Sequence, residues 1–247
     1  MNNSTQTILP KTDNSNSFQV QDLFDAIGLD RHLEQITKKS DNQQIDLVQR
    51  QQLIALFRLA LGTGQKRLQR RHLTRASGQY IVEGRAKLVD AILQRIFNLL
   101  HSNPIKQPFS LIATGGYGRG ELAPFSDIDL LFLISDEMSE DQEASVERML
   151  YCLWDLGLDI GHAVRTIDDC VQQARQDLEI RTSMLESRFL AGDQEIFNTY
   201  KKTLFNKVLD KNPEGFLRAK ILEQSKRHEK FGNTHFYLEP NIKENPG

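Results

Sequence analysis

The stretch ATGGYGRGELAPFSDIDLLFLIS, residues 113–135, determines the fold of the chain. The end of an apolar run leads into a glycine-dense segment at 115–120, which we call the glycine turn. Asp127 and Asp129 then stand at the start of a second apolar run, 130–134. This order predicts a strand, a turn that can hold a phosphate, and a second strand that carries two carboxylates.

The two aspartates are two residues apart, so on a strand they point to the same face. Ile128 and Leu130 would then point to the opposite face. Two carboxylates held close together repel each other and titrate as a coupled pair, and a cation between them keeps both ionised. Ligands that are all oxygen favour Mg²⁺ or Mn²⁺. Asp127 and Asp129 therefore predict a divalent-metal site at the beginning of a central, doubly buried strand.

The glycines complete the prediction. Gly115 and Gly116 have no side chains, so their backbone N–H groups can approach an anion closely. A phosphate chain held there would lie beside the metal, as in-line displacement at phosphorus requires. A Walker A loop is excluded because Glu121 follows the glycines where that motif has Lys. A dinucleotide-binding turn is disfavoured because the spacing is GxGxG and Pro124 comes too soon for a long helix. A glycine-rich connection with incidental acids is the structural alternative.

Composition limits the classes of protein to consider. The chain has 247 residues and a formal net charge of −2, which gives no reason to expect nucleic acid or a membrane as a partner. No apolar run approaches the roughly 20 residues that span a bilayer, and the polar N-terminus lacks the apolar core of a signal peptide. Cys152 and Cys170 are not spaced like a zinc site, and we expect reduced thiols. These features predict a cytoplasmic protein.

Helical periodicity surrounds the central stretch and predicts an α+β fold with a small mixed sheet. A helix that begins near Phe18 is expected to end at Gly28, and a short helix should cover residues 31–38. Gly62 and Gly64 are expected to interrupt the next helix. The firmest helical patterns cover 45–61, 86–100, 139–156 and 214–230.

Three more elements are expected after the second strand. Residues 158–166 alternate in polarity, which predicts a third strand. Thr166, with Asp169 three residues later, matches a capping box, and the helix that it begins should run toward Ala191. Asp193 should cap another helix that ends near residue 209.

A basic run, residues 66–72, has two interpretations. It could be a patch for a triphosphate or a nucleic acid, or simply the solvated face of a helix.

The central stretch resembles the nucleotidyltransferase superfamily, whose motif is an apolar strand, Gly-Gly or Gly-Ser, and Asp-x-Asp in a second strand. The longer string GGYGRGELAPFSDIDLLFL (115–133) resembles the amino-terminal domain of the bacterial PII uridylyltransferase/uridylyl-removing enzyme family. LWDLGLDIGHAVRT (153–166), SMLESRFLAGD (183–193) and HFYLEPNIKENPG (235–247) agree with that resemblance.

The resemblance implies a polymerase-beta-like nucleotidyltransferase core flanked by helical segments. It also implies that the chain stops before any HD phosphohydrolase or ACT domain, so that it would lack uridylyl removal and glutamine sensing. The expected division is a disordered tail, a helical extension, the nucleotidyltransferase core and a C-terminal helical segment. The corresponding ranges are 1–17, 18–100, 101–192 and 193–247.

The reaction implied by the resemblance is transfer of UMP from magnesium-bound UTP to a tyrosine hydroxyl of the PII signal protein, with release of pyrophosphate. Asp127 and Asp129 would be the catalytic metal ligands. Gly115, Gly116 and Ser126 would hold the triphosphate. Arg119 is a candidate phosphate clamp, with a surface salt bridge as its alternative.

The superfamily usually has a third carboxylate on a neighbouring strand, which can act as a base toward the attacking hydroxyl. Asp159 and Asp168 are the candidates for that position. His162 and Arg165 are three apart on the expected third strand, so at most one of them faces the site. Two other functions stay open at this point. One is a nucleotidyltransferase that acts on another protein or a small molecule, and the other is a non-catalytic nucleotide-binding regulatory module.

Overall fold

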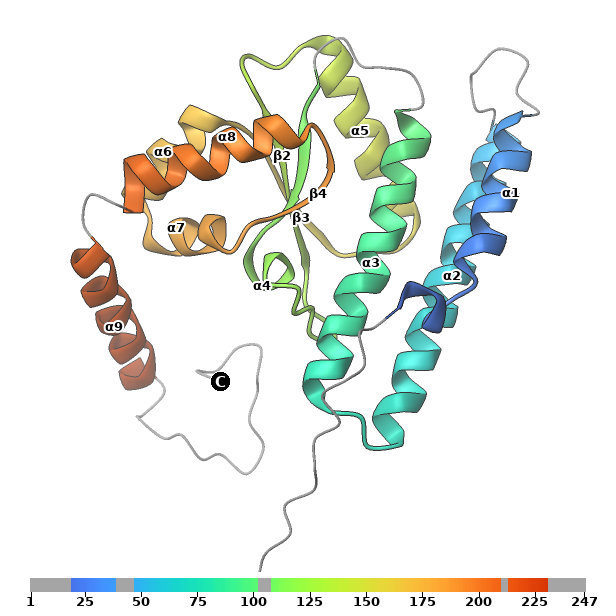
Figure 1. Cartoon of the computed structure of the whole chain (residues 1–247), viewed down its shortest axis with the longest axis horizontal. Helices are drawn as coiled ribbons and strands as arrows, with labels where there is room; N and C mark the ends of the chain where they lie inside the picture. Colours follow the sequence, from blue (N-terminus) through green and yellow to red (C-terminus); the bar gives the residue numbers. More distant parts are fainter. Residues whose placement is uncertain (1–18, 39–46, 102–107, 210–212, 231–247) are drawn as a thin grey trace, which may run out of the picture.

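The computed structural model describes residues 19–38, 47–101, 108–209 and 213–230 (Figure 1). The expected disordered tail at 1–17 and the segment 235–247 lie outside this part of the chain. The elements, in chain order, are η1 (Val20–Asp22), α1 (Ala26–Lys38), α2 (Leu47–Leu73), α3 (Gly78–Leu100), β1 (Ser110–Ala113), α4 (Gly115–Gly118), β2 (Ile128–Ile134), α5 (Glu140–Asp155), β3 (Ile160–Thr166), α6 (Ile167–Gln176), α7 (Leu178–Leu185), β4 (Arg188–Gly192), α8 (Gln194–Leu204), η2 (Phe205–Leu209) and α9 (Pro213–Lys230).

The strands of the described residues form one four-stranded sheet with the order β3-β2-β1-β4. β1 pairs antiparallel with both β2 and β4, whereas β2 and β3 run parallel. The sheet is therefore mixed and small, and the α+β class predicted from the sequence is confirmed. β2 has a neighbour on each side, which confirms that the strand after Asp129 is central.

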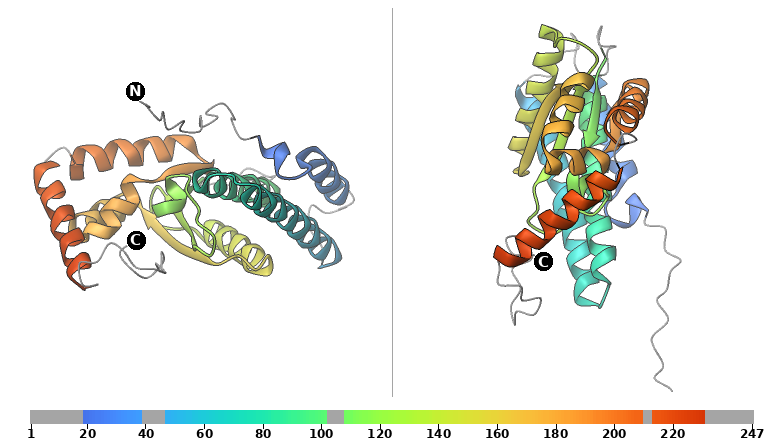
Figure 2. Two further views of the ribbon diagram at one scale, coloured as in Figure 1. Left: turned by 90° about the horizontal axis from the view of Figure 1, so that it is seen from below. Right: turned by 90° about the vertical axis from the view of Figure 1, so that its left-hand side faces the viewer.

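Helices cover both faces of the sheet (Figures 1 and 2). The face that carries Leu130 and Phe132 packs into one large core with α1, α2, α3 and α5. The opposite face carries Leu131 and Leu133 and packs into a smaller core with α6, α7 and α8. The amino-terminal helices thus share a continuous core with the sheet, and the second core lies on the face to which Asp129 points.

Glycines do not end or interrupt the amino-terminal helices, so these predictions were wrong. Gly28 lies in the first turn of α1, where its N–H donates to the Asp25 carboxylate at 2.9 Å. α2 continues through Gly62 and Gly64 to Leu73. Gly64 is buried against α3, where a Cβ would lie 2.6 Å from Cδ1 of Leu88. The small residue therefore allows two helices to approach closely, which outweighs its low helix propensity.

The predicted helix from Thr166 toward Ala191 was also wrong, although its beginning was right. The Thr166–Asp169 capping box is present. The helix then ends at Asp177, which has an extended backbone and whose side chain accepts from Ile180 N–H at the start of α7. Ala191 belongs to β4, a strand that the sequence pattern missed because its apolar residues follow a helix without a break. Pairing with β1 stabilises it as a strand.

The other predicted elements are present in the structure. α3, α5 and α9 include most of the residues expected to be helical, and β3 is the predicted third strand. Asp193 caps α8 by accepting hydrogen bonds from Glu195 and Ile196 N–H groups. Within the residues described above, no helix is both long enough and apolar enough to cross a membrane.

Gly64 and Gly62 provide a matched test of helix packing. Gly64→Ala should lower the free energy of unfolding by about 1–3 kcal/mol, because the new methyl group overlaps Leu88. Gly62→Ala should raise it by about 0.5–1 kcal/mol, because nothing lies within 4 Å of the position and alanine favours a helix. Urea unfolding of both variants measures this difference. Equal effects would show that α2 and α3 do not approach closely at Gly64.

Candidate functional site: the glycine turn, two aspartates and a cavity

The glycine turn forms a single helical turn, α4, directly after β1. Thr114 N–H donates to the backbone oxygen of Asp129 at 3.1 Å, so the turn is joined to the first residues of β2. Gly115 has a φ of +58°, a conformation that side chains disfavour. Gly118 packs against the backbone before β4, where a Cβ would lie 2.3 Å from the Glu186 oxygen. Glycine is therefore required at both positions by geometry.

Asp129 lies between two glycines. A Cβ at Gly115 would lie 3.2 Å from Oδ2 of Asp129, and a Cβ at Gly161 would lie 2.6 Å from Oδ1. Ile128 is buried and Asp129 is exposed, as the expected alternation of faces requires. Partial burial raises the pKa of Asp129, and the negative charge of Asp127 raises it further. The two carboxylates are therefore close enough to repel each other.

A divalent cation fits this pair of side chains. The carboxylates provide oxygen ligands, and a positive charge between them would offset both the burial and the repulsion that raise the Asp129 pKa. Within the described ranges, no group of three or more His, Cys, Asp or Glu side chains is arranged to hold a metal ion. Mg²⁺ is commonly held by one or two carboxylates, with substrate phosphates and water as the remaining ligands. The residues present suit that kind of site.

A cavity of about 550 Å³ opens beside the glycine turn. Its volume lies within the range that small-molecule ligands occupy in proteins. The wall is made by the turn, by α7 and by α9. The residues that line it are Gly115, Gly116, Arg119, Glu179, Thr182, Ser183, Glu186, Lys220, Glu223, Lys226 and Arg227.

The predicted nucleotide-binding residues take different places relative to this cavity. Gly115, Gly116 and Arg119 line it. Asp129 adjoins it through Gly115, as the distances above show. Ser126 is not one of the lining residues; it lies in the loop immediately before Asp127, where its N–H donates to the Ala123 oxygen at 3.2 Å.

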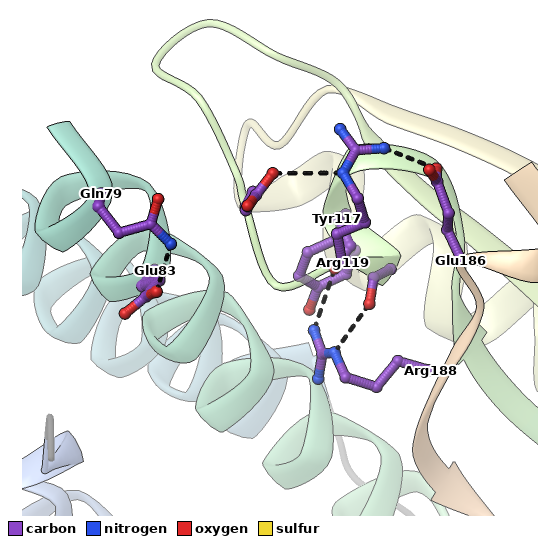
Figure 3. Close-up of polar contacts among 8 residues, drawn as sticks. Gln79, Glu83, Tyr117, Arg119, Glu186 and Arg188 are labelled. Atoms are coloured by element: carbon purple, nitrogen blue, oxygen red, sulfur yellow. Dashed lines mark hydrogen bonds and ion pairs between the residues drawn. The ribbon is translucent and has the colours of Figure 1, made fainter.

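Arg119 makes the salt bridges that the sequence analysis gave as its alternative role. Its guanidinium lies 3.2 Å from the Glu121 carboxylate and 2.6 Å from that of Glu186 (Figure 3). Partial burial lowers the pKa of Arg119, but the hydrogen bonds and charges of the two glutamates together raise it above its usual value. Arg119 therefore stays charged at the cavity wall.

Asp159 and Asp168 lie at opposite ends of β3. The backbone oxygen of Asp159 accepts from Ile128 N–H at 2.9 Å, so Asp159 lies beside Asp127 at the edge of the sheet. Gly161 pairs with Asp129 and faces it, and Asp159 is the exposed residue immediately before β3. Asp168 lies beyond the other end of the strand, about 20 Å away at a rise of roughly 3.3 Å per residue.

The remaining candidates lie outside the cavity wall. His162 contacts Trp154, with ring centroids 6.2 Å apart. Arg165 lies near Cys170 and Asp169: burial raises the pKa of the Cys170 thiol to about 12 and the Arg165 charge opposes that rise, whereas hydrogen bonds from Thr166 lower the pKa of Asp169 and Arg165 adds to that effect. The basic run 66–72 belongs to the last part of α2 and is exposed except for its one leucine. It is thus a mostly solvated helix face.

Sequence reasoning assigned no role to α7 or α9 residues at the cavity. Ser183 lies near Gly115, at 3.7 Å from the position of a Cβ there, and Lys220 lines the same cavity from α9. Ser183 and Glu186 are part of the segment 183–193 that carried the family resemblance, which was the available signal. The cationic residues of α9 gave no such signal, because their pattern is that of an ordinary exposed helix.

A buried polar cluster holds the glycine turn in place (Figure 3). Arg188 of β4 makes a two-pronged ion pair with Asp90 of α3, at 2.8 and 3.1 Å. Tyr117 donates its hydroxyl to Asp90 at 2.6 Å, and its backbone oxygen accepts from Arg188 at 3.1 Å. Burial raises the pKa of Tyr117 well above its usual value, and Asp90 adds to that effect, so the phenol stays protonated.

Removal of the Arg188 guanidinium tests this cluster. Arg188→Met should lower the free energy of unfolding by about 1–3 kcal/mol, because Asp90 keeps its charge in a largely buried place and loses its partner. The control is Arg50→Met, which breaks an ion pair with Asp155 whose side chains are both about half exposed. It should change stability by about 0.5 kcal/mol or less. Similar losses in both variants would contradict the anchoring role of Arg188.

Comparison with known protein families matches two parts of the chain. Residues 65–161 match the family described as putative nucleotidyltransferase DUF294. This segment contains the glycine turn and both aspartates. Residues 215–247 match the family described as GlnD PII-uridylyltransferase. That segment begins within α9. Each matched segment therefore contributes residues to the wall of the cavity.

Similar curated proteins are bifunctional uridylyltransferase/uridylyl-removing enzymes. The protein from Azospirillum brasilense is 43% identical over 202 residues, which are 79% of this chain and 22% of the relative. The protein from Rhodospirillum rubrum is 39% identical over 216 residues, 84% of this chain and 23% of the relative. That from Rhodopseudomonas palustris is 36% identical over 209 residues, 82% of this chain and 22% of the relative. The chain spans less than a quarter of the length of these relatives.

The family matches and the curated relatives agree with one another, since all of them are described as nucleotidyltransferases or uridylyltransferases. This agrees with the strand, glycine turn and Asp-x-Asp arrangement found in the structure. The resemblance noted in the sequence is confirmed by these comparisons. Over 79–84% of its length, the chain is thus similar to enzymes of the PII-uridylyltransferase type.

Proposed function

We propose that this chain catalyses metal-dependent uridylyl transfer from UTP to a tyrosine hydroxyl of a PII signal protein, in the cytoplasm. The observation that supports this most directly is the position of Asp129. Its carboxylate lies against Gly115, which lines the cavity, and near Asp127. Nucleotidyl transfer needs carboxylates that can hold a cation. It also needs backbone N–H groups, not covered by side chains, beside a cavity that can take the nucleotide.

The reaction is a displacement at the α-phosphorus of the nucleotide. The attacking hydroxyl oxygen forms a bond to that phosphorus, the bond to the bridging oxygen breaks, and pyrophosphate leaves. Mg²⁺ or Mn²⁺, when bound, neutralises charge on the phosphate oxygens. Asp127 and Asp129 would hold the metal, and the backbone of Gly115 and Gly116 would orient the triphosphate. Arg119 would contribute a positive charge at the wall of the cavity.

Asp159 is the third carboxylate in this proposal. Its backbone oxygen accepts from Ile128 N–H, so it lies at the same edge of the sheet as Asp127, which supports this choice. A carboxylate there could accept the proton of the attacking hydroxyl. Asp168 is not suited to that role, because its carboxylate is at the other end of β3, 3.5 Å from the Lys207 ammonium.

The activity is tested by incubating the chain with Mg²⁺, purified PII protein and UTP or ATP labelled at the α-phosphate. Label should appear on PII from UTP. Asp127→Asn and Asp129→Asn should each lower the transfer rate at least about a hundredfold, because the metal loses a charged ligand. Without metal, Asp129→Asn should melt no lower than the parent protein, since it removes a carboxylate whose ionised form is disfavoured. Nucleotide binding without transfer would point instead to a nucleotide-binding module.

The two candidates for the third carboxylate form a matched pair. Asp159→Asn should lower the transfer rate by about a hundredfold or more, as expected for loss of a general base. Asp168→Asn should leave the rate within about twofold, because the change breaks only an exposed ion pair. Initial rates at saturating UTP measure both. The assignment fails if Asp168→Asn is the more damaging change.

A further inference from the structure

The wall of the cavity opposite the glycine turn is formed by one side of α9. Lys220, Lys226 and Arg227 line the cavity together with Gly115 and Gly116. The three cationic residues are spaced so that their side chains fall on one side of a helix. The positive side chains of α9 and the backbone of the two glycines therefore lie on opposite walls of the cavity.

A contact with α7 fixes which side of α9 faces the cavity. The Arg181 guanidinium of α7 lies 5.8 Å from the centre of the Phe216 ring. Phe216 is four residues before Lys220 and seven before Glu223, so helical spacing places all three on one side. Figure 1 shows α9 next to α7 and on the far side of the sheet from α1 and α2. The orientation of α9 is thus set by packing as well as by charge.

The Glu223 carboxylate forms salt bridges with two of these cations. Glu223 accepts from the Lys220 ammonium at 2.5 Å and from the Arg227 guanidinium at 2.8 Å. Lys220 and Glu223 are each less than one third exposed, so this pair is held more firmly than a surface salt bridge. Lys226 lines the cavity too, and in the described part of the chain no carboxylate pairs with it.

The cavity is more positive than the rest of the chain. The lining contains four cationic side chains and three carboxylates, whereas the whole chain has a net charge of −2. Two of the lining carboxylates, Glu186 and Glu223, are already paired with lining cations. The α9 wall, with three cations and one carboxylate, is therefore the part of the lining that is suited to a negatively charged ligand.

We propose that Lys220, Lys226 and Arg227 bind the polyphosphate of the nucleoside triphosphate, opposite the backbone of Gly115 and Gly116. This rests on the proposed function and assigns the positioning of its substrate to α9. Negative charge develops on the leaving pyrophosphate during transfer, so fixed cations there would favour the reaction as well as binding. The match that begins at residue 215 would then contribute substrate-binding side chains to a site whose metal ligands lie in the match at 65–161.

The test uses the full chain and inorganic tripolyphosphate, which needs no recognition of a base. Lys220→Gln and Lys226→Gln should each weaken tripolyphosphate binding in calorimetry by about fivefold or more. The matched control is Arg218→Gln, the same change of charge on the same helix at a site that does not line the cavity and is 83% exposed. It should change the affinity by less than about twofold. Thermal melts confirm that each variant is folded.

Two results would overturn the proposal. One is that the lysine variants bind tripolyphosphate as the Arg218→Gln control does. The other is that the parent chain does not bind tripolyphosphate at all.

Transfer assays on the same variants separate this proposal from the proposed function. The lysine variants should raise KM for UTP by the same factor as the tripolyphosphate Kd. Lysine-dependent tripolyphosphate binding without label transfer to PII would support the α9 site and contradict the transferase. Transfer of label with an unchanged KM for UTP in both lysine variants would support the transferase and contradict the α9 site.

Discussion

The ion pair between Arg188 and Asp90 is the interaction on which the candidate site depends. It joins β4 to α3, and through Tyr117 it also joins both of them to the glycine turn. Apart from the buried Tyr117 side chain, the turn is held mainly by contacts to its backbone, because its glycines have no side chains that could pack. Arg188 makes those contacts by donating to the backbone oxygens of Tyr117 and Gly118. The position of the glycine-turn backbone is thus set by an edge strand and a helix of the amino-terminal layer.

The site combines two opposite electrostatic environments. At the edge of the sheet, Asp127 and Asp129 repel each other, and missing side chains at Gly115 and Gly161 leave room around Asp129. Across the cavity, the wall contributed by α9 is rich in cations. A divalent cation with a polyphosphate would complement both, since the metal would meet the carboxylates and the phosphates would meet the cations.

Local patterns predicted the elements whose signal is contained in a few neighbouring residues. The exposed Asp129 between buried neighbours followed from strand alternation, and the Thr166–Asp169 capping box followed from a four-residue motif. Long-range contacts decided what the patterns missed. Gly64 looked like a helix interruption because its partner, Leu88, is on another helix. β4 became a strand through pairing with β1, and the role of α9 at the cavity depends on its contact with α7, none of which is encoded locally.

The position of Arg188 also has a consequence for the order of folding during synthesis. The glycine turn and both aspartates leave the ribosome long before β4 does, because β4 ends at residue 192. Until then Asp90 lacks its cationic partner, β1 lacks its second neighbour, and the turn lacks the donor that holds its backbone. The carboxylates and the turn are therefore present in the nascent chain before the geometry of a binding site exists. The cavity wall is completed later still, because α9 follows β4 in the chain.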